Sequence, residues 1–169
     1  MIPCSLRTAA LPSKCVSATS LEEVLIEFHV EAGGKPLPDE QQRQLTDWIT
    51  TVIQDRHATV GPINYIFCGD DYLHQLNVDY LDHDTLTDII TFPYSQFPEI
   101  SGDLFISTER VVDNANELGT SYLAELHRVM IHGVLHLCGQ GDKTDEEAAE
   151  MRRLEDWALD LRPEGMCEV

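Results

Sequence analysis

The chain has 169 residues, 43% of them hydrophobic, which is typical of one globular domain with a single core. No segment approaches the roughly 20 consecutive apolar residues of a membrane-spanning helix, so no membrane association is expected. The formal net charge of −19, with no Lys or Arg between Arg56 and Arg110, favours solubility and argues against a general polyanion-binding surface.

The start of the chain differs in composition from the rest. It is poor in acidic side chains and rich in Ser and Ala, and it lacks the continuous apolar stretch of a secretory signal. We interpret residues 1–20 as a loose N-terminal extension, with an organellar targeting segment as the alternative, and residues 21–169 as a single domain.

The five cysteines contain no CxxC pair, which indicates neither a disulfide framework nor a thiolate zinc site. The expected compartment is therefore the cytoplasm.

Hydrophobic periodicity predicts strands in the first part of the chain and mainly helices in the second part. The expected strands are residues 21–30, 63–68, 88–92 and 103–107, and the expected helices are residues 39–57, 70–80, 109–118, 122–138 and 146–161. Residues 93–101 are expected to form a Pro-containing loop, and Thr144 with Glu147 forms the capping-box pattern of the last helix. This order predicts an α+β fold, with about four strands in one small mixed sheet packed by helices.

Two histidines lie four residues apart on the helix expected at 122–138. The apolar side chains of this helix form one stripe, at Leu123, Leu126, Met130, Val134 and Leu137. At 100° per residue, His132 and His136 fall on nearly the opposite side from this core-facing stripe, one turn apart. That is the separation that two imidazoles need to bind one ion at about 2.0–2.1 Å each. The alternative for such a pair alone is an ordinary exposed helix face.

The residues after this helix supply a third candidate ligand. Gly139 stands where a helix commonly ends, because glycine adopts positive φ without a Cβ penalty, and a turn there can bring Asp142 back to the two rings. The spacing is that of metzincin ligands, with Asp in place of the third His, and three protein ligands leave a coordination position open. The sequence therefore predicts a metzincin-like metal-binding helix and a catalytic type of metal site at His132, His136 and Asp142. The alternative for Asp142 is a turn residue.

The residue after the first histidine is Gly133. Proteolytic zincins have a Glu at this position as the general base, and glycine cannot transfer a proton, so peptide hydrolysis by that route is disfavoured. We interpret this glycine as leaving free space beside the metal for a bulky or phosphate-containing substrate.

Three stretches extend the pattern: LNVDYLDHDTLTDIITFP at 76–93, GDLFI at 102–106 and HGVLHLCG at 132–139. In this order and spacing they closely resemble the YbeY family of bacterial metal-dependent endoribonucleases, and with the acidic last helix the resemblance covers about residues 21–161. The resemblance implies an α+β fold, a zinc ion held by the histidine helix, and a role in ribosomal RNA maturation. Thr87 and Asp88 belong to the family signature around the cleft. The alternative for both is a local cap or turn, and Gly102-Asp103 is expected to be a turn before a strand.

The sequence departs from the family pattern at two positions. The family usually has a third His where this chain has Asp142, which is still a normal zinc ligand but lowers the net charge of the site, so a bound water should be acidified less. The family also usually has an Arg at the position of Leu81, and its absence removes a candidate phosphate contact. A protonated His83, or Lys143, could supply that contact. The alternatives are a loop histidine with a local partner and a solvated lysine.

The leading hypothesis is a zinc-dependent, single-strand-specific endoribonuclease that acts in late small-subunit (16S) rRNA maturation and ribosome quality control. A metal-bound water is the expected nucleophile, and iron or nickel would suit the same donor set. The expected partners are a ribosomal RNA precursor and either the small ribosomal subunit or a basic ribosomal protein. One alternative is a ribosome-assembly or ribosome-binding factor with a structural metal, which the acidity and Leu81 favour. Another is a divergent metallopeptidase, which Gly133 disfavours.

Overall fold

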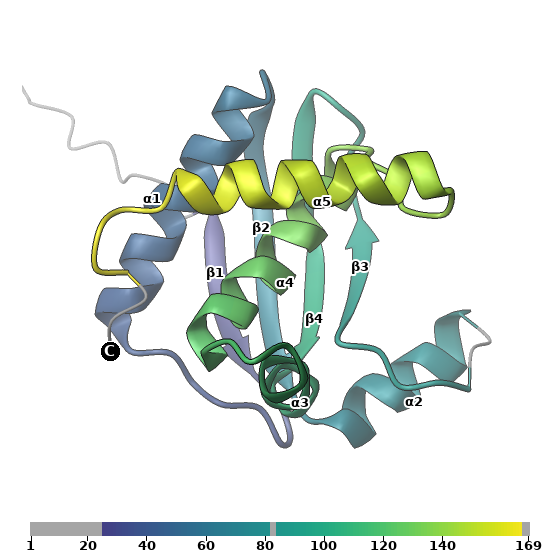
Figure 1. Cartoon of the computed structure of the whole chain (residues 1–169). Coiled ribbons are helices and arrows are strands. Elements are labelled where there is room, and N and C mark those ends of the chain that lie inside the picture. The colour runs from purple at the N-terminus through teal and green to yellow at the C-terminus, as the bar shows by residue number, and fades with distance from the viewer. Residues whose placement is uncertain (1–24, 82–83, 167–169) are drawn as a thin grey trace, which may run out of the picture.

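The structure is a computed structural model that describes residues 25–81 and 84–166 (Figure 1). The expected extension at 1–20, residues 21–24 of the first expected strand, and His83 lie outside the described residues. The elements along the described chain are β1 (Ile26–Val30), α1 (Asp39–Asp55), β2 (Thr59–Cys68), α2 (Asp70–Leu81), β3 (Ile89–Pro93), β4 (Glu99–Ser107), α3 (Thr108–Leu118), α4 (Tyr122–Leu137) and α5 (Asp145–Asp160). Among these, no helix is long and apolar enough to cross a membrane.

The four strands form one mixed sheet in the order β1-β2-β4-β3. β1 pairs with β2, and β2 with β4, in parallel, whereas β3 pairs with β4 antiparallel. Parallel neighbours need long crossover connections, and α1 supplies the one between β1 and β2. The expected α+β fold with a four-stranded mixed sheet is confirmed.

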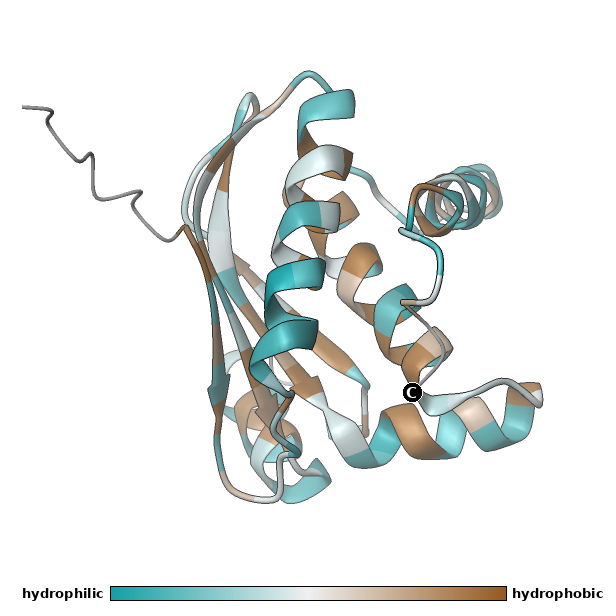
Figure 2. Cartoon of the chain, turned by 90° about the vertical axis from the view of Figure 1, so that its left-hand side faces the viewer, coloured by the Kyte–Doolittle hydropathy of each residue, from teal (hydrophilic) through white to brown (hydrophobic). Residues whose placement is uncertain are grey.

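Helices cover one face of this sheet. In Figure 2 the sheet is one layer, α1 and α4 lie against it, and α5 lies outside them, with hydrophobic residues turned toward the interior. The core between these layers includes the fully buried side chains of Trp48, Tyr65 and Phe67. The indole N–H of Trp48 donates to the backbone oxygen of Ala158 at 2.8 Å, which joins α1 to α5. The layers therefore enclose α4.

β2 begins earlier than the sequence pattern predicted. It starts at Thr59 rather than at residue 63, because the strand continues through Gly61 and Pro62. Its pairing with β4 shifts register between Val60 and Ile63, which is the irregularity expected where a glycine and a proline interrupt a strand. The two residues bend the strand without ending it.

β4 also begins earlier than predicted, at Glu99 rather than at residue 103. The loop expected at 93–101 is present but shorter, at 94–98, and the expected turn at Gly102-Asp103 is wrong, because both residues lie within β4. A Cβ at Gly102 would lie 2.4 Å from the backbone oxygen of Phe92 on β3. The glycine thus permits a close contact between two paired strands. Its neighbours in the sequence had suggested a turn instead.

α4 is buried on several sides. The predicted core stripe is confirmed at Leu126, Met130, Val134 and Leu137, whereas Leu123 is half-buried. The remaining buried residues of the helix include Glu125, His127, Val129, Ile131 and Leu135, because α1, α3 and α5 pack against the sides that do not face the sheet. The prediction that the two histidines lie on a face away from the core is wrong, because both side chains are largely buried. The side chains of His132 and His136 are only 24% and 28% exposed.

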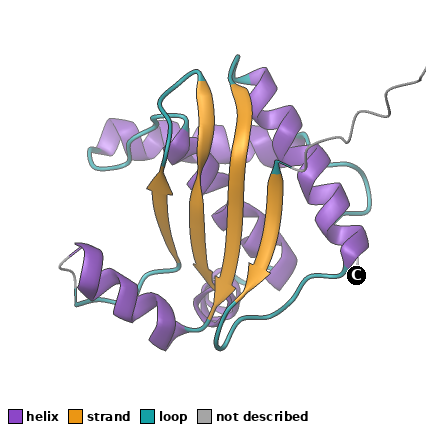
Figure 3. Cartoon of the chain, turned by 180° about the vertical axis from the view of Figure 1, so that it is seen from behind, coloured by secondary structure: helices purple, strands orange, loops and turns teal. Residues whose placement is uncertain are grey.

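The other face of the sheet carries far less cover. Figure 3 views this face, and of the described helices only α2 packs against it, through a small cluster of Cys68, Leu73 and Ile90. A row of aromatic ring contacts leads from this cluster toward the solvent, formed by Tyr72, Phe105, Phe92 and Tyr80. The metal-ligand candidates lie on the opposite, helix-covered side.

Candidate metal centre

The structure brings the three predicted ligands together at the C-terminal end of α4. The Nε2 atoms of His132 and His136 are 2.9 Å apart. The Oδ2 atom of Asp142, in the loop between α4 and α5, is 3.7 Å from the first of these nitrogens and 3.4 Å from the second. They are the only group of three His, Cys, Asp or Glu side chains within the described residues whose ligand atoms are close enough to hold an ion.

The hydrogen bonds of the two rings define which nitrogens are free to bind an ion. The Nδ1 atom of His132 is 2.8 Å from the Oε1 atom of Glu155, and the Nδ1 atom of His136 is 2.8 Å from the backbone oxygen of Gln140. Both partners are acceptors, so each Nδ1 carries a hydrogen. In the neutral rings both Nε2 atoms then have lone pairs, which face each other at 2.9 Å and face a carboxylate oxygen. Three converging electron pairs repel one another unless a cation lies between them.

The spacing of these atoms fits a small metal ion. Ligands at about 2.0–2.1 Å from a tetrahedral zinc lie about 3.3–3.4 Å from one another, and the three measured separations bracket this value. Two imidazole nitrogens and one carboxylate oxygen are donors that zinc, iron and nickel all accept. The half-exposed Asp142 leaves one side of the centre open, as in catalytic rather than structural sites.

The loop that carries Asp142 is fixed at both ends. Gly139 ends the helix with φ +86°, which lets the backbone N–H of Gln140 return to the oxygen of Leu135. At the other end, the carboxylate of Glu147 accepts from the backbone N–H groups of Lys143 and Thr144 and completes the predicted capping box. The predicted helix end and the predicted cap therefore together position the third ligand.

Glu155 is a functional residue that the sequence pattern did not single out. It lies on α5, its side chain is only 7% exposed, and it binds His132 through one oxygen and Arg128 through the other, at 2.8 and 2.9 Å. Burial alone would raise the pKa of this carboxyl, but the hydrogen bonds from His132 and Arg128 outweigh burial and hold its pKa below the ordinary value. A signal was present, since Glu155 lies on the apolar stripe of α5, beside Met151, Leu154 and Ala158.

With this geometry established, comparison with known proteins assigns the chain to a family. The family described as endoribonuclease YbeY matches residues 30–161. The chain belongs to this family. The endoribonuclease YbeY of Flavobacterium johnsoniae is 53% identical over 117 residues, which cover 69% of this chain and 84% of that protein. The endoribonuclease YbeY of Bacteroides thetaiotaomicron is 46% identical over 129 residues, which cover 76% of this chain and 94% of that protein.

A solved structure supports the fold assignment. The chain is similar to the solution structure of TM1509 from Thermotoga maritima, with a TM-score of 0.60 and 24% sequence identity, over 80% of this chain and 87% of that chain. At this identity the likeness concerns the fold alone. The resemblance to the YbeY family that the sequence motifs indicated is confirmed.

In this member of the YbeY family, Gly133 has a packing role. A Cβ at this position would lie 2.3 Å from the Cδ2 atom of Leu104 and 2.6 Å from the Cδ1 atom of Ile89. The glycine therefore faces the sheet, and neighbouring side chains fill the space beside it. The interpretation of Gly133 as open room for a substrate is wrong; the residue lets α4 approach the sheet, and a glutamate there would collide with the core.

Two clefts meet at His132. The first, of about 560 Å³, is lined by both histidines, Asp142, Lys143 and residues 87–91 and 93. The second, of about 330 Å³, lies between α3, α4 and α5. Both clefts share Asp88, Ile89 and His132, so they adjoin. The first cleft gives a substrate access to the open side of the metal centre.

The other predicted site residues divide into those at the clefts and those elsewhere. Thr87 and Asp88 line the first cleft and also make local bonds: the Thr87 hydroxyl donates to the oxygen of Ile89, and Asp88 accepts from the side chain of Asn114. Lys143 lines the same cleft. Leu81 ends α2, and within the described chain no residue of α2 lines either cleft.

Proposed function

We propose that the protein is a zinc-dependent endoribonuclease that cleaves single-stranded segments of ribosomal RNA precursors. Membership of a family described as endoribonuclease YbeY supports the reaction class. The observation that carries the proposal is the convergence of the Nε2 atoms of His132 and His136 and one oxygen of Asp142 at the wall of an open cleft. Zinc bound there would polarise a phosphoryl oxygen of the substrate, which is the chemistry that such a centre supplies.

The chain's own residues position this reaction. His132, His136 and Asp142 would hold the ion, and Glu155 fixes the ring of His132 so that its Nε2 atom points at the ion. Ile89, Ile90 and Pro93 of β3 line the same cleft as the ligands and give it an apolar surface, against which a sugar or base can pack. Gly133 leaves no carboxylate in the position of the zincin base, which separates this reaction from peptide hydrolysis.

The proposed substrate is the small-subunit rRNA precursor, with action late in 16S rRNA maturation and in ribosome quality control. The resemblance of the motifs at 76–93, 102–106 and 132–139 to the YbeY family supports this assignment.

Cleavage of RNA by matched variants tests this proposal. Purified wild-type protein, with zinc added back, should cleave a single-stranded RNA and leave a duplex of the same sequence intact. His136→Ala should lose the activity, whereas His29→Ala, which removes an exposed histidine of β1 outside the two clefts at the centre, should keep it. Equal cleavage by wild type and His136→Ala would indicate a contaminating nuclease and contradict the proposal.

A second candidate function is docking on the small ribosomal subunit, with the metal in a structural role. The open face of the sheet favours it. This face presents the exposed rings of Tyr80 and Tyr94, which are 68% and 66% exposed, beside the carboxylate of Asp103, which accepts from the Tyr94 hydroxyl at 2.6 Å. No Lys or Arg occurs between residues 56 and 110, the segment that supplies β2, β3, β4 and α2. An aromatic and acidic surface of this kind complements a basic ribosomal protein.

Co-sedimentation separates the two functions. If docking is the function, the chain should sediment with small subunits after the metal is removed by a chelator, and Tyr94→Ala with Asp103→Asn should abolish the association. Loss of sedimentation on metal removal, or its absence at every salt concentration, would contradict docking and leave the nuclease as the sole candidate.

A further inference from the structure

Several Lys and Arg residues of this acidic chain lie beside the metal centre. Nine Lys and Arg side chains belong to the described residues. Three of them line the two clefts that meet at His132: Lys143 in the first, and Arg128 and Arg152 in the second. A net charge of −19 makes most of the surface repel polyanions. At the two clefts, these three cations lie among four carboxylates, those of Asp88, Glu125, Asp142 and Glu155.

The two arginines of the second cleft differ in their contacts. Arg128 is committed to acidic partners, with Nη1 2.9 Å from Glu155 and Nη2 3.0 Å from Asp156. Arg152 lies 3.8 Å from Glu155, which is too long for a hydrogen bond, and its side chain is 66% exposed. Both oxygens of Glu155 are already taken by His132 and Arg128. The guanidinium of Arg152 therefore keeps its donors available for a ligand.

Lys143 occupies the corresponding place on the other side of the centre. Its backbone N–H donates to Glu147 at 3.0 Å, which fixes the main chain directly after the ligand Asp142. Lys143 lines the cleft together with both histidines. Because the two clefts adjoin at His132, Lys143 and Arg152 line adjoining clefts that meet at a ligand of the metal centre.

We propose that Lys143 and Arg152 bind the backbone phosphates that flank the scissile phosphate of a single-stranded RNA. The proposal rests on the proposed nuclease function and gives its substrate a path, from the cleft of Lys143 past His132 into the cleft of Arg152. A guanidinium binds phosphate through two N–H groups, and an ammonium binds it as a compact charge. Such contacts set the register of a strand without reading its bases.

Lys143 and Arg152 would make the phosphate contacts that a leucine at position 81 cannot make. The second cleft also holds three carboxylates, Asp88, Glu125 and Glu155, which limit the affinity for RNA. Glu155 forms an ion pair with Arg128, and Asp88 accepts from the side chain of Asn114. Binding through so few cations on an acidic chain should be weak and strongly dependent on salt.

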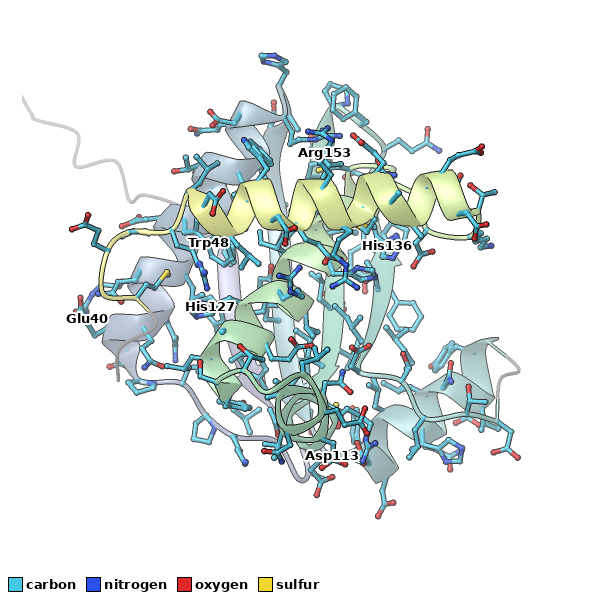
Figure 4. The ribbon with its side chains drawn as sticks, in the orientation of Figure 1. Glu40, Trp48, Asp113, His127, His136 and Arg153 are labelled. Carbon is cyan, nitrogen blue, oxygen red and sulfur yellow. The ribbon has the colours of Figure 1, made fainter. Side chains whose placement is uncertain are left out.

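The chain offers a matched control for Arg152. Arg153 is its neighbour on α5, is 64% exposed and also has a glutamate three residues away, Glu150, which it binds at 2.6 Å. Arg153 lines neither cleft, and Figure 4 draws it on the opposite side of α5 from His136. Removal of either charge changes the net charge of the protein equally, so the two variants differ in position and in the ion pair with Glu150 that only Arg153→Met removes.

The test measures binding of a short fluorescent 2′-O-methyl single strand to the zinc-loaded protein over a range of salt concentrations, with the strand's integrity checked on a gel. Arg152→Met and Lys143→Met should each weaken binding at least about threefold at low salt and reduce the slope of log affinity against log salt by about 0.7, the value for one phosphate contact on a single strand. Arg153→Met should match the wild type in both quantities.

The outcomes separate this inference from the function on which it rests. If the wild type binds and cleaves RNA while Arg152→Met behaves like Arg153→Met, the proposed path is wrong and the nuclease function stands. If the wild type neither binds nor cleaves a single strand, the nuclease function itself is contradicted.

Discussion

Glu155 on α5 holds the ring of His132 on α4 through a contact of 2.8 Å between its Oε1 atom and the ring's Nδ1 atom. The contact does two things. It fixes the tautomer that leaves Nε2 free to bind an ion, and it couples the last helix to the metal centre. Arg128 holds the second oxygen of the same carboxylate, so both oxygens of the buried carboxylate are hydrogen-bonded and its charge is paired with a guanidinium.

Glu155→Gln should weaken zinc binding by about 10- to 100-fold, because the amide accepts the ring N–H less strongly and no longer raises the basicity of the imidazole. Competition with a chromophoric chelator measures the zinc affinity directly. Glu150→Gln is the control, since Glu150 lies on the same helix and its one ion pair among the described residues is with Arg153. Circular dichroism verifies that both variants are folded. Equal zinc affinity in the two variants would contradict the role of Glu155.

Gly133→Ala should destabilise the protein by about 1–3 kcal/mol through overpacking, although the same change in an exposed helix stabilises by up to about 1 kcal/mol. The reason is the contact that the new Cβ would make with Leu104 and Ile89. Urea unfolding of the variant gives the free energy of unfolding. In a Leu104→Ala background the added methyl should cost less, and an unchanged or stabilising effect in the wild-type background would show that the position is not packed.

His127 should make the stability fall in mild acid. Burial, together with the charge of Arg162, lowers the pKa of His127 from 6.5 to about 4. The unfolded chain therefore binds a proton more readily, and the free energy of unfolding decreases as the pH falls from about 6.5 toward about 4, by at most about 3 kcal/mol. Above about pH 6.5 the contribution is fully present.

The measurement is urea unfolding at several pH values for the metal-free wild type and for His127→Gln. Gln fills a similar volume and does not titrate in this range, so its curve should depend less on pH than that of the wild type. Parallel pH dependences would show that His127 is not responsible, because the other histidines remain in both proteins.

Much of the fold and most of the site could be predicted from the sequence. Helix phase and a helix-ending glycine place His132, His136 and Asp142 near one another, since these are local properties of one segment. The boundaries of β2 and β4 could not be predicted, because Gly61 and Gly102 resemble turn residues until their strand partners are known. The boundaries of these two strands depend on contacts between segments that are far apart in the sequence.

The same reason explains the errors at the site. Gly133 was interpreted from its chain neighbours, whereas its role is set by Leu104 and Ile89 across the core. Glu155 belongs to the centre only because α5 crosses α4, although an acid on an apolar helix stripe is a signal that sequence patterns offer. The three metal ligands lie close together in the sequence, whereas the residues that support them, such as Glu155, come from other segments of the chain.

Elemental analysis of protein purified without an affinity tag tests the metal centre most directly. The wild type should contain one zinc ion per chain, and Asp142→His should retain it, because histidine restores a nitrogen donor at the third position. Asp142→Ala should lose most of the metal, and His136→Ala should lose all of it. A wild type without bound transition metal after zinc is supplied, or equal metal content in the wild type and Asp142→Ala, would contradict the three-ligand centre.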